Sequence, residues 1–374
     1  MSTQTSKVRP QHSPEPTGPV VAVTGAATGV GRALVERLRA IADPGAVGRI
    51  VAIDDHSDDF DGVTWEVTDI CNPSFAPRIS GVDVLVHTAD DRSLESSPAD
   101  RRAHNVRAAQ TILTAAAAQR VSRVILLTST MVYGADPANP IPMSEDSPVS
   151  AELGAGTIGD FAEVEDLARV ARRAHPGLSV TVVRPAPLVG PGIDTLLTRH
   201  FAAPRLLTVK GQEQAWQFCH VDDLVSALEF VVVHDIDGKD GALAVGCDGA
   251  LSQAETEEIA GLRGFDVPAN VAFSATQRLH RVGITPATSS EMKFLVYPCV
   301  VDCRTLREAG WRPAYDNETS LRALLEARTG KPALVGRNLG RKEATITAAS
   351  AAGAAVAAVG TTAAIRYLRK RRKG

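Results

Sequence analysis

The chain has 374 residues, of which 44% are hydrophobic, 22% are charged and only 4% are aromatic. This composition is typical of a globular protein and excludes a disordered, collagen-like or coiled-coil chain. The five cysteines are few and scattered, so they predict no disulfide framework and favour a reducing compartment. No second pair or nearby histidine accompanies Cys299 and Cys303, and we expect no metal site.

Charge is distributed unevenly along the chain. Residues 331–374 contain ten Lys or Arg and one acidic residue, so this segment carries +9. Since the whole chain carries −3, the first 330 residues carry −12. An acidic body of this kind is not typical of a nucleic-acid-binding protein, and we expect no nucleic-acid partner.

The first half of the chain predicts alternating strands and helices. Residues 1–18 are polar and contain no apolar run, which predicts a disordered leader rather than a signal peptide. From residue 20 onward, short apolar runs alternate with longer helical segments. Strands are expected at 20–23, 51–53, 82–86, 124–127 and 180–183, and helices at 30–42, 98–119 and 157–174. This alternation predicts an α/β fold, a Rossmann-type, doubly wound parallel sheet covered by helices on both faces.

The pattern becomes less regular after residue 185. We expect a strand at 242–246 and helices at 222–234, 252–262 and 318–328. The predicted organisation is therefore a Rossmann domain at 19–185, a smaller substrate or lid region at 186–330 that also contains late elements of the sheet, and a basic, Ala-rich helical tail at 331–374.

A glycine motif follows the first predicted strand and opens the first predicted helix. It reads Thr-Gly-Ala-Ala-Thr-Gly-Val-Gly-Arg over residues 24–32. Gly25 allows a tight turn, while Gly29 and Gly31 allow backbone N–H groups and the helix start to approach a pyrophosphate. The position between a strand and a helix makes this a strong dinucleotide-binding signal. Thr28 and Val30 lie in the same loop and are predicted to contact the cofactor.

Two acidic residues, Asp54 and Asp55, end the second predicted strand. A carboxylate at this place accepts hydrogen bonds from the adenosine ribose and repels a 2′-phosphate, so we predict that Asp54 binds NAD rather than NADP. Two alternatives stay open. Both acids can be solvated loop residues, and Arg32 beside the glycine loop can hold a phosphate instead.

Further motifs resemble one enzyme family over residues 20–328. The resemblance is to the extended short-chain dehydrogenases/reductases, the NAD-dependent epimerase/dehydratase family, and to its nucleotide-sugar epimerase-like members. The matching positions are Asp69 and Ile70 (an adenine contact in the family), the strand-end residues His87, Thr88 and Ala89, the strand-end residues Thr128 and Ser129, the loop start Arg184 and Pro185, and the segments 218–223 and 301–313. The resemblance implies that the first four groups lie near NAD, although His87 is as readily explained by packing.

The resemblance also implies a partner and a substrate. Family members dimerise through the helices that correspond to 98–119 and 157–174, and the small residues 115–118 permit close helix contact. The family's substrates imply a small hydroxylated molecule such as a sugar nucleotide. Two positions depart from this, because Pro187 and Trp216 stand where nucleotide-sugar members often carry Asn and Arg.

The largest departure concerns the catalytic Tyr-x-x-x-Lys pair of the family. Alignment of the helix at 157–174 places Ile158 at the Tyr position and Ala162 at the Lys position. No Lys occurs between Lys7 and Lys210, and none of the four Tyr is followed by Lys four residues later. Proton transfer that accompanies hydride transfer therefore lacks its usual group. Ser129 is the provisional catalytic residue, whereas Glu163 and Asp166 are better explained as a solvated helix face.

The tail at 344–365 has no charged residue and is followed by a basic cluster at 366–373. Its 22 residues are long enough to span a bilayer, but eleven of them are Ala and few are strongly apolar, so insertion is marginal. A span, a helix on an anionic membrane surface and a soluble helix all stay open. We expect a cytoplasmic protein, with association through 344–373 as an open alternative.

Three hypotheses of different classes follow. The chain is an NAD-dependent epimerase/dehydratase-like oxidoreductase with a displaced acid/base group, which we favour. The second hypothesis is a catalytically degenerate NAD-binding sensor or scaffold. The third is a structural partner that its tail recruits to a membrane.

Overall fold

A computed structural model describes residues 18–94, 96–152, 156–281 and 287–329. The predicted leader at 1–18, apart from Gly18, and the predicted tail at 331–374 lie outside these residues. Of the described helices, none is long and apolar enough to cross a membrane.

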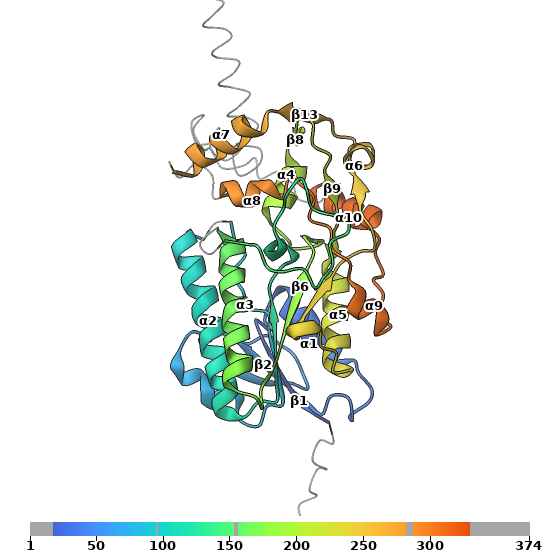
Figure 1. The fold of residues 1–374 in the computed structure, drawn as a ribbon. Helices are drawn as coiled ribbons and strands as arrows, with labels where there is room; N and C mark the ends of the chain where they lie inside the picture. Colours follow the sequence, from blue (N-terminus) through green and yellow to red (C-terminus); the bar gives the residue numbers. More distant parts are fainter. Residues whose placement is uncertain (1–17, 95, 153–155, 282–286, 330–374) are drawn as a thin grey trace, which may run out of the picture.

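Seven parallel strands form the central sheet (Figure 1) in the order β11-β6-β5-β4-β1-β2-β3. Their bounds are β1 Val20–Thr24, β2 Arg49–Asp54, β3 Thr64–Val67, β4 Val84–His87, β5 Arg123–Leu127, β6 Ser179–Pro185 and β11 Ala242–Val245. Every neighbouring pair is parallel. The strand order runs outward from β1 to β3 and then continues on the other side of β1 with β4. This reversal between β1 and β4 creates the crevice where ligands bind in doubly wound sheets.

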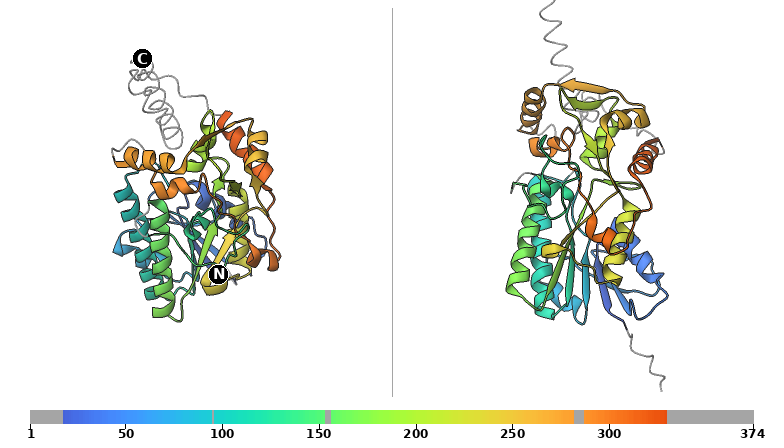
Figure 2. Two further views of the ribbon diagram at one scale, coloured as in Figure 1. Left: turned by 45° about the horizontal axis from the view of Figure 1, so that its top comes forward. Right: turned by 45° about the vertical axis from the view of Figure 1, so that its right-hand side comes forward.

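Helices cover both faces of the sheet (Figure 2). On one face α1 (Gly29–Arg39) and α5 (Val221–Val233) pack together, and their apolar residues share a core with β1 and β2. On the other face lie α2 (Pro98–Gln119), α3 (Thr157–Ala174) and the short 3-10 helix η1 (Pro73–Ile79). The predicted doubly wound Rossmann-type fold is confirmed.

A smaller region lies at the carboxyl end of the sheet. It contains the short strands β7 Leu188–Val189, β8 Leu206–Val209, β9 Ala215–Trp216, β10 Cys219–His220, β12 Leu251–Ser252 and β13 Gly264–Val267. Its helices are α4 Leu196–Ala202, α6 Gln253–Ala260, α7 Ala269–Arg281, α8 Ser289–Lys293 and α10 Asn317–Thr329, while α9 Arg304–Glu308 packs by β11. Phe201, Trp216 and Phe218 form the centre of a separate core here.

The boundary at residue 185 separates these regions only in part. Both α5 and β11 come from the later sequence, yet they belong to the layers of the central sheet. The smaller region is therefore an addition to the carboxyl edge of the sheet.

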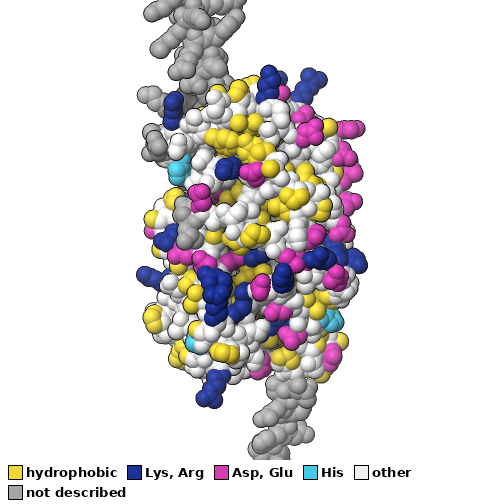
Figure 3. Space-filling view, viewed as in Figure 1, with side chains coloured by type: hydrophobic (Ala, Val, Ile, Leu, Met, Phe, Trp, Pro, Cys, Tyr) yellow, Lys and Arg dark blue, Asp and Glu magenta, His cyan; other side chains and the backbone are white. Residues whose placement is uncertain are grey.

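Figure 3 shows hydrophobic side chains on the upper part of the face seen in Figure 1, while Lys and Arg side chains are grouped across its middle.

One strand is missing from the sequence prediction. Strand β3 is not predicted, because it is an edge strand with a mixed sequence, Thr-Trp-Glu-Val, and no apolar run. Of the small residues at 115–118, Ala115 and Ala116 are buried within the chain and Ala118 is exposed. The predicted dimer contact through these helices stays a prediction.

Candidate functional site

The candidate site begins as a cleft at the carboxyl ends of β1 and β4. The glycine loop contributes Gly25, Thr28, Gly29 and Val30 to its wall, and the end of β2 contributes Asp54. The residues after β4 form the opposite side, and Thr88, Ala89, Asp90, Asp91 and Arg92 line it. Six of the residues that the sequence predicts near the cofactor, apart from Asp54, thus line one cleft: Gly25, Thr28, Gly29, Val30, Thr88 and Ala89.

Gly25 and Gly31 are each required for a different physical reason. Gly25 has a φ of +70°, a conformation that side-chain-bearing residues rarely adopt. Gly31 lies inside α1, and a Cβ there would stand only 2.1 Å from the Gly25 carbonyl oxygen and 2.5 Å from Thr88 Oγ1. A side chain at 31 would therefore push the start of α1 away from the loop that must approach a phosphate.

Asp54 both faces the cleft and braces the glycine loop. Its Oδ2 accepts a hydrogen bond from the Ala27 N–H at 2.9 Å, and its Oδ1 accepts one from the Asp55 N–H at 2.8 Å. Arg32 is engaged elsewhere, in ion pairs with Glu36 and Asp58 at 3.3 Å each. This arrangement supports the choice of a ribose hydroxyl over a 2′-phosphate at this end of the cleft.

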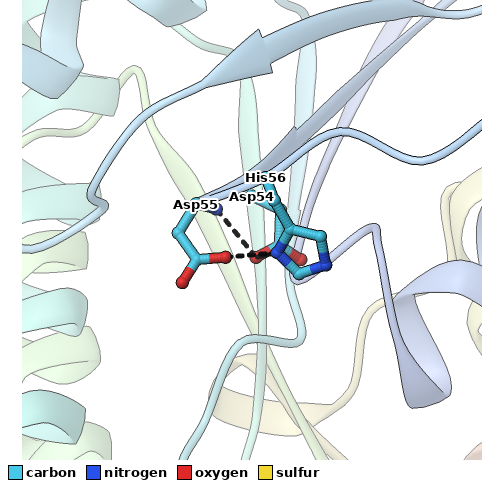
Figure 4. Close-up of side chains that lie close together, drawn as sticks. All are labelled: Asp54, Asp55 and His56. Carbon is cyan, nitrogen blue, oxygen red and sulfur yellow. Dashed lines mark hydrogen bonds and ion pairs between the residues drawn. The ribbon is translucent and has the colours of Figure 1, made fainter.

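His56 stands over the same acidic pair (Figure 4). Its Nδ1 lies 2.5 Å from Asp55 Oδ1 and 4.0 Å from Asp54 Oδ1. The hydrogen bond with His56 lowers the pKa of Asp55. Asp54, Asp55 and His56 each offer one atom that could bind a metal ion, and these three atoms lie within 4.8 Å of one another. Asp55 and His56 are exposed, however, and exposed acidic groups are common without a metal.

His87 and Thr88 follow each other at the end of β4 but point in different ways. The His87 ring Nδ1 lies 2.8 Å from Thr24 Oγ1, and its side chain is buried beneath the cleft. Burial lowers the pKa of His87 to about 3, so the ring is neutral at physiological pH. Thr88 Oγ1 donates to the Thr24 carbonyl at 2.6 Å and does line the cleft. The packing interpretation of His87 is the one that this geometry supports.

Asp69 and Ile70 are not among the residues that line the cleft. Asp69 Oδ1 accepts a hydrogen bond from the Cys71 N–H at 2.8 Å, and Ile70 is buried in the core beneath α2. Their predicted adenine contact stays a prediction.

A buried polar network connects Thr128, Glu165, Arg184 and Tyr133 behind the cleft. Arg184 donates to both carboxylate oxygens of Glu165, at 3.0 and 2.6 Å, and to the Tyr133 hydroxyl oxygen at 2.7 Å. Thr128 Oγ1 donates to the same carboxylate at 2.8 Å. Burial alone lowers the pKa of Arg184, but its hydrogen bonds and charge interaction with Glu165 raise it overall. Neither Arg184 nor Pro185 is among the residues that line the cleft, and their predicted contact with the cofactor stays a prediction.

Tyr133 cannot replace the missing catalytic tyrosine in this arrangement. Its hydroxyl donates to the Glu145 carbonyl oxygen at 2.6 Å and accepts from Arg184. Burial raises the pKa of Tyr133 to about 12, which makes it a weaker acid than a free tyrosine. Ser129 is better placed, because it lines the cavity that adjoins the cleft. The Ser129 Oγ donates a long hydrogen bond, 3.4 Å, to the Pro185 carbonyl and accepts one from the Met131 N–H at 3.2 Å.

Helix α3 presents apolar side chains where the family has its catalytic pair. Ile158 and Phe161 line a second cavity, the one that adjoins the cleft, together with Thr157 at the helix start. Ala162, the aligned Lys position, lines a different groove beside Glu165 and Arg184. Neither the aligned positions nor the cavity-facing ones carry a Tyr or a Lys.

The second cavity lies between the sheet and the smaller region. Its lining is mostly apolar and includes Leu94, Met131, Ile158, Phe161, Leu188, Leu196, Leu197, Trp216, Phe294 and Leu295. Arg92 and Leu188 line both this cavity and the nucleotide cleft, so the two compartments meet at these residues.

Arg92 is a site residue that sequence reasoning missed. Its Nε forms an ion pair with Asp90, its Nη2 donates to the Thr128 carbonyl at 2.9 Å, and its guanidinium lies 4.7 Å from the centre of the Phe161 ring. The available signal was an Arg three residues after Ala89, in the loop that follows the strand end beside the cofactor. A single Arg in an acidic loop does not reveal which way it points.

Comparisons with known proteins point to one family. A family model described as the NAD dependent epimerase/dehydratase family matches residues 21–246. The chain is 30% identical over 308 residues to Rv0501 of Mycobacterium tuberculosis, which covers 79% of this chain and 80% of that protein. Protein YeeZ of Escherichia coli is 28% identical over 163 residues, covering 44% of this chain and 53% of YeeZ.

Solved structures share the fold at low sequence identity. MoeE5 in complex with UDP-glucuronic acid and NAD is 22% identical, with a TM-score of 0.60, covering 83% of this chain and 98% of that one. The dTDP-glucose 4,6-dehydratase DesIV from Streptomyces venezuelae is 20% identical, with a TM-score of 0.60, covering 83% and 97%. Gox2253 is 19% identical, with a TM-score of 0.65, covering 84% and 99%. These likenesses concern the fold.

Proposed function

Because the chain belongs to the NAD-dependent epimerase/dehydratase family, we propose that it is an oxidoreductase that uses NAD on a hydroxylated small molecule by transient hydride transfer. The observation that carries this proposal is the cleft itself. It combines the loop at Gly25 and Gly29, the closely packed start of α1 at Gly31 and the carboxylate of Asp54. A second cavity opens directly beside it.

The residues of the cleft fit an NAD molecule. Backbone N–H groups at the start of α1 can bind a pyrophosphate, and Asp54 can accept from the adenosine ribose. Bound NAD supplies a hydride acceptor that can return the hydride to the same or another face of the substrate. The chain's own contribution is to hold the reacting hydroxyl near Ser129 and to exclude water through the apolar walls at Phe161 and Leu188.

Several finer points belong to the same proposal. NAD is the preferred cofactor over NADP because Asp54 lies at the end of β2. A homodimer through α2 and α3 rests on the resemblance to the family, and the mass of the purified chain in solution tests it. The neighbours' ligands make a sugar nucleotide one substrate class to test.

A cytoplasmic location follows from the cysteine usage, and fractionation of a chain that lacks 331–374 tests its tail as a membrane anchor.

One specific observation favours a second candidate function, an NAD-binding sensor or scaffold. Helix α3 carries Ile158, Phe161 and Ala162 where proton-transfer groups are expected, so the usual base is missing. A protein of this kind binds NAD without reducing it.

Turnover separates the two functions. The purified full chain is incubated with NAD and a panel of alcohols and sugar nucleotides. Both reduced nicotinamide and the isomerised, dehydrated or oxidised product are followed, because a hydride that returns to the substrate leaves no reduced cofactor. The oxidoreductase predicts turnover that falls about 10-fold or more in Ser129→Ala, since Ser129 lies in the cavity wall beside the cleft. Tight NAD binding without turnover of any substrate supports the sensor, and an unchanged rate in Ser129→Ala removes Ser129 from the chemistry.

A further inference from the structure

The second cavity lacks the groups that bind a pyrophosphate. Of the described residues that line it, Arg92 is the single cation and Glu291 the single anion. The charge of Arg92 is already balanced by Asp90, whose side chain is only 11% exposed. A diphosphate carries about two negative charges and needs more than one compensating group in a half-enclosed site.

Side chains of the protein already bond backbone N–H groups at two helix starts in this cavity. The Thr157 N–H, at the start of α3, donates to Glu291 Oε1 at 3.1 Å. The Thr195 and Thr198 side chains cap the start of α4, where the Thr195 N–H donates to Thr198 Oγ1 at 2.8 Å. Backbone N–H groups that face a cavity at a helix start are the usual anion donors, and here those of Thr157, Thr195 and Thr198 are bonded to side chains of the protein.

Three further polar side chains of the lining are engaged within the protein. The Gln217 amide donates to the Cys247 and Val301 carbonyls, at 2.8 and 2.9 Å. The Gln214 amide donates to the Phe294 carbonyl at 2.9 Å, and Trp216 Nε1 donates to Gln253 at 2.9 Å. What these groups leave toward the cavity is mostly apolar surface, which favours a ligand with an apolar body.

Arg92 provides the exception at the boundary between the two compartments. Its Nε and Nη2 are bonded to Asp90 and Thr128, while its Nη1 has no hydrogen-bond partner among the described residues. The ion pair and the contact with Phe161 fix the guanidinium in place. A guanidinium whose charge is balanced by Asp90 can still donate a hydrogen bond to a neutral carbonyl or hydroxyl oxygen, whereas an anionic ligand would need a further positive charge.

We infer that the second cavity binds a neutral ketone or alcohol with a mainly apolar body, and that Arg92 donates the hydrogen bond that holds its oxygen. This inference rests on the proposed function and names its substrate class. Arg92 is thus a specificity-determining residue. Ser129 lines the same cavity, and its hydroxyl provides a second contact for the oxygen of the ligand.

Calorimetric titration of the full chain tests the inference. NAD is titrated first, so that a failure of the proposed function is seen separately. Acetophenone, 4-phenyl-2-butanone, 2-decanone and UDP-glucose are then titrated with and without NAD. We expect at least one ketone to bind more tightly than UDP-glucose. Arg92→Met, which keeps an apolar stem, should weaken that ketone about 10-fold, the effect of removing a charged hydrogen-bond donor.

Arg102→Met is the matched control. Arg102 is an exposed α2 residue that is ion-paired with Glu163 and does not line the cavity. It should leave ketone affinity unchanged. Tighter binding of UDP-glucose than of every ketone overturns the inference, as does the absence of ketone binding or an unchanged ketone affinity in Arg92→Met. Loss of NAD binding in Arg92→Met assigns Arg92 to the cofactor and overturns it too. If Arg92→Met does not fold, the wild-type comparison alone decides.

Discussion

The nucleotide cleft and the adjoining cavity are built in different ways. The cleft depends on backbone conformation at Gly25 and Gly31 and on one carboxylate, Asp54. The cavity depends on side chains from distant parts of the chain, such as Arg92, Ile158 and Trp216. A backbone-based site tolerates few residue types, whereas a side-chain-based site can change its chemistry while the fold persists. The absence of the Tyr-Lys pair beside a loop that keeps Gly25 and Gly31 illustrates this difference.

Gly31→Ala should break the cleft and give the largest effect. The added Cβ would meet the Gly25 carbonyl oxygen at 2.1 Å, a backbone atom that cannot move without opening the loop. We expect NAD affinity to fall more than about 100-fold, and titration calorimetry measures this. Gly177→Ala is the control, because a Cβ there meets nothing within 4 Å and Gly177 does not line the cleft. Equal affinities in both variants would contradict the account of the loop.

Arg184→Met tests whether the network behind the cleft supports the fold or the cofactor. It leaves the buried Glu165 carboxylate with Thr128 as its remaining side-chain partner, so we expect a loss of about 3 kcal/mol in the free energy of unfolding. Chemical denaturation measures this loss, and the double variant Arg184→Met/Glu165→Met should recover part of it. NAD affinity of the folded single variant should change less than about 2-fold. A large loss of NAD affinity with little loss of stability would restore Arg184 to the cofactor site.

His200→Phe tests the wall behind the apolar cavity through its pH dependence. His200 is fully buried, stacks on Trp216 with ring centres 5.7 Å apart, and has no hydrogen-bond partner for either ring nitrogen among the described residues. Burial lowers its pKa to about 3. Between about pH 6.5 and 3 the unfolded chain therefore binds the extra proton, and stability falls as the pH falls.

At pH 5 the Phe variant should consequently be about 2 kcal/mol more stable than the wild type, with a smaller gain at pH 7. Denaturant unfolding at both pH values measures the difference. His87 has the same direction of pKa shift and is retained, so a residual pH dependence persists in the variant. Parallel pH profiles of the two proteins would show that His200 is not held neutral by burial.

Asp54→Asn should give a smaller effect on the cleft. Asn keeps one acceptor oxygen where Asp54 accepts from both Ala27 and Asp55, and it removes the charge that opposes a 2′-phosphate. We expect NAD affinity to fall about 10-fold and the preference for NAD over NADP to shrink. Asp55→Asn is the matched control, because the Asp55 side chain is 80% exposed and does not line the cleft. If Asp55→Asn has the larger effect, the two roles must be exchanged.

The sequence predicted the cleft better than the cavity for a physical reason. Turns that need Gly25 and a close approach that needs Gly31 leave a local signature, and the strand end at Asp54 follows from a run of apolar residues. The direction in which Arg92 points depends on Asp90, Thr128 and Phe161, which lie on three separate segments. Likewise, the engagement of Arg184 with Glu165 depends on how α3 packs on β6, and no local pattern records it.

Titration of NAD and NADP into the purified full chain tests the central claim most directly. The account predicts saturable NAD binding in the micromolar range, weaker NADP binding, and a rise in the unfolding temperature at saturating NAD, because a ligand that binds the folded state stabilises it. A folded protein that binds neither nucleotide and whose unfolding temperature is unchanged by both would contradict the claim that the cleft between β1 and β4 is a dinucleotide site.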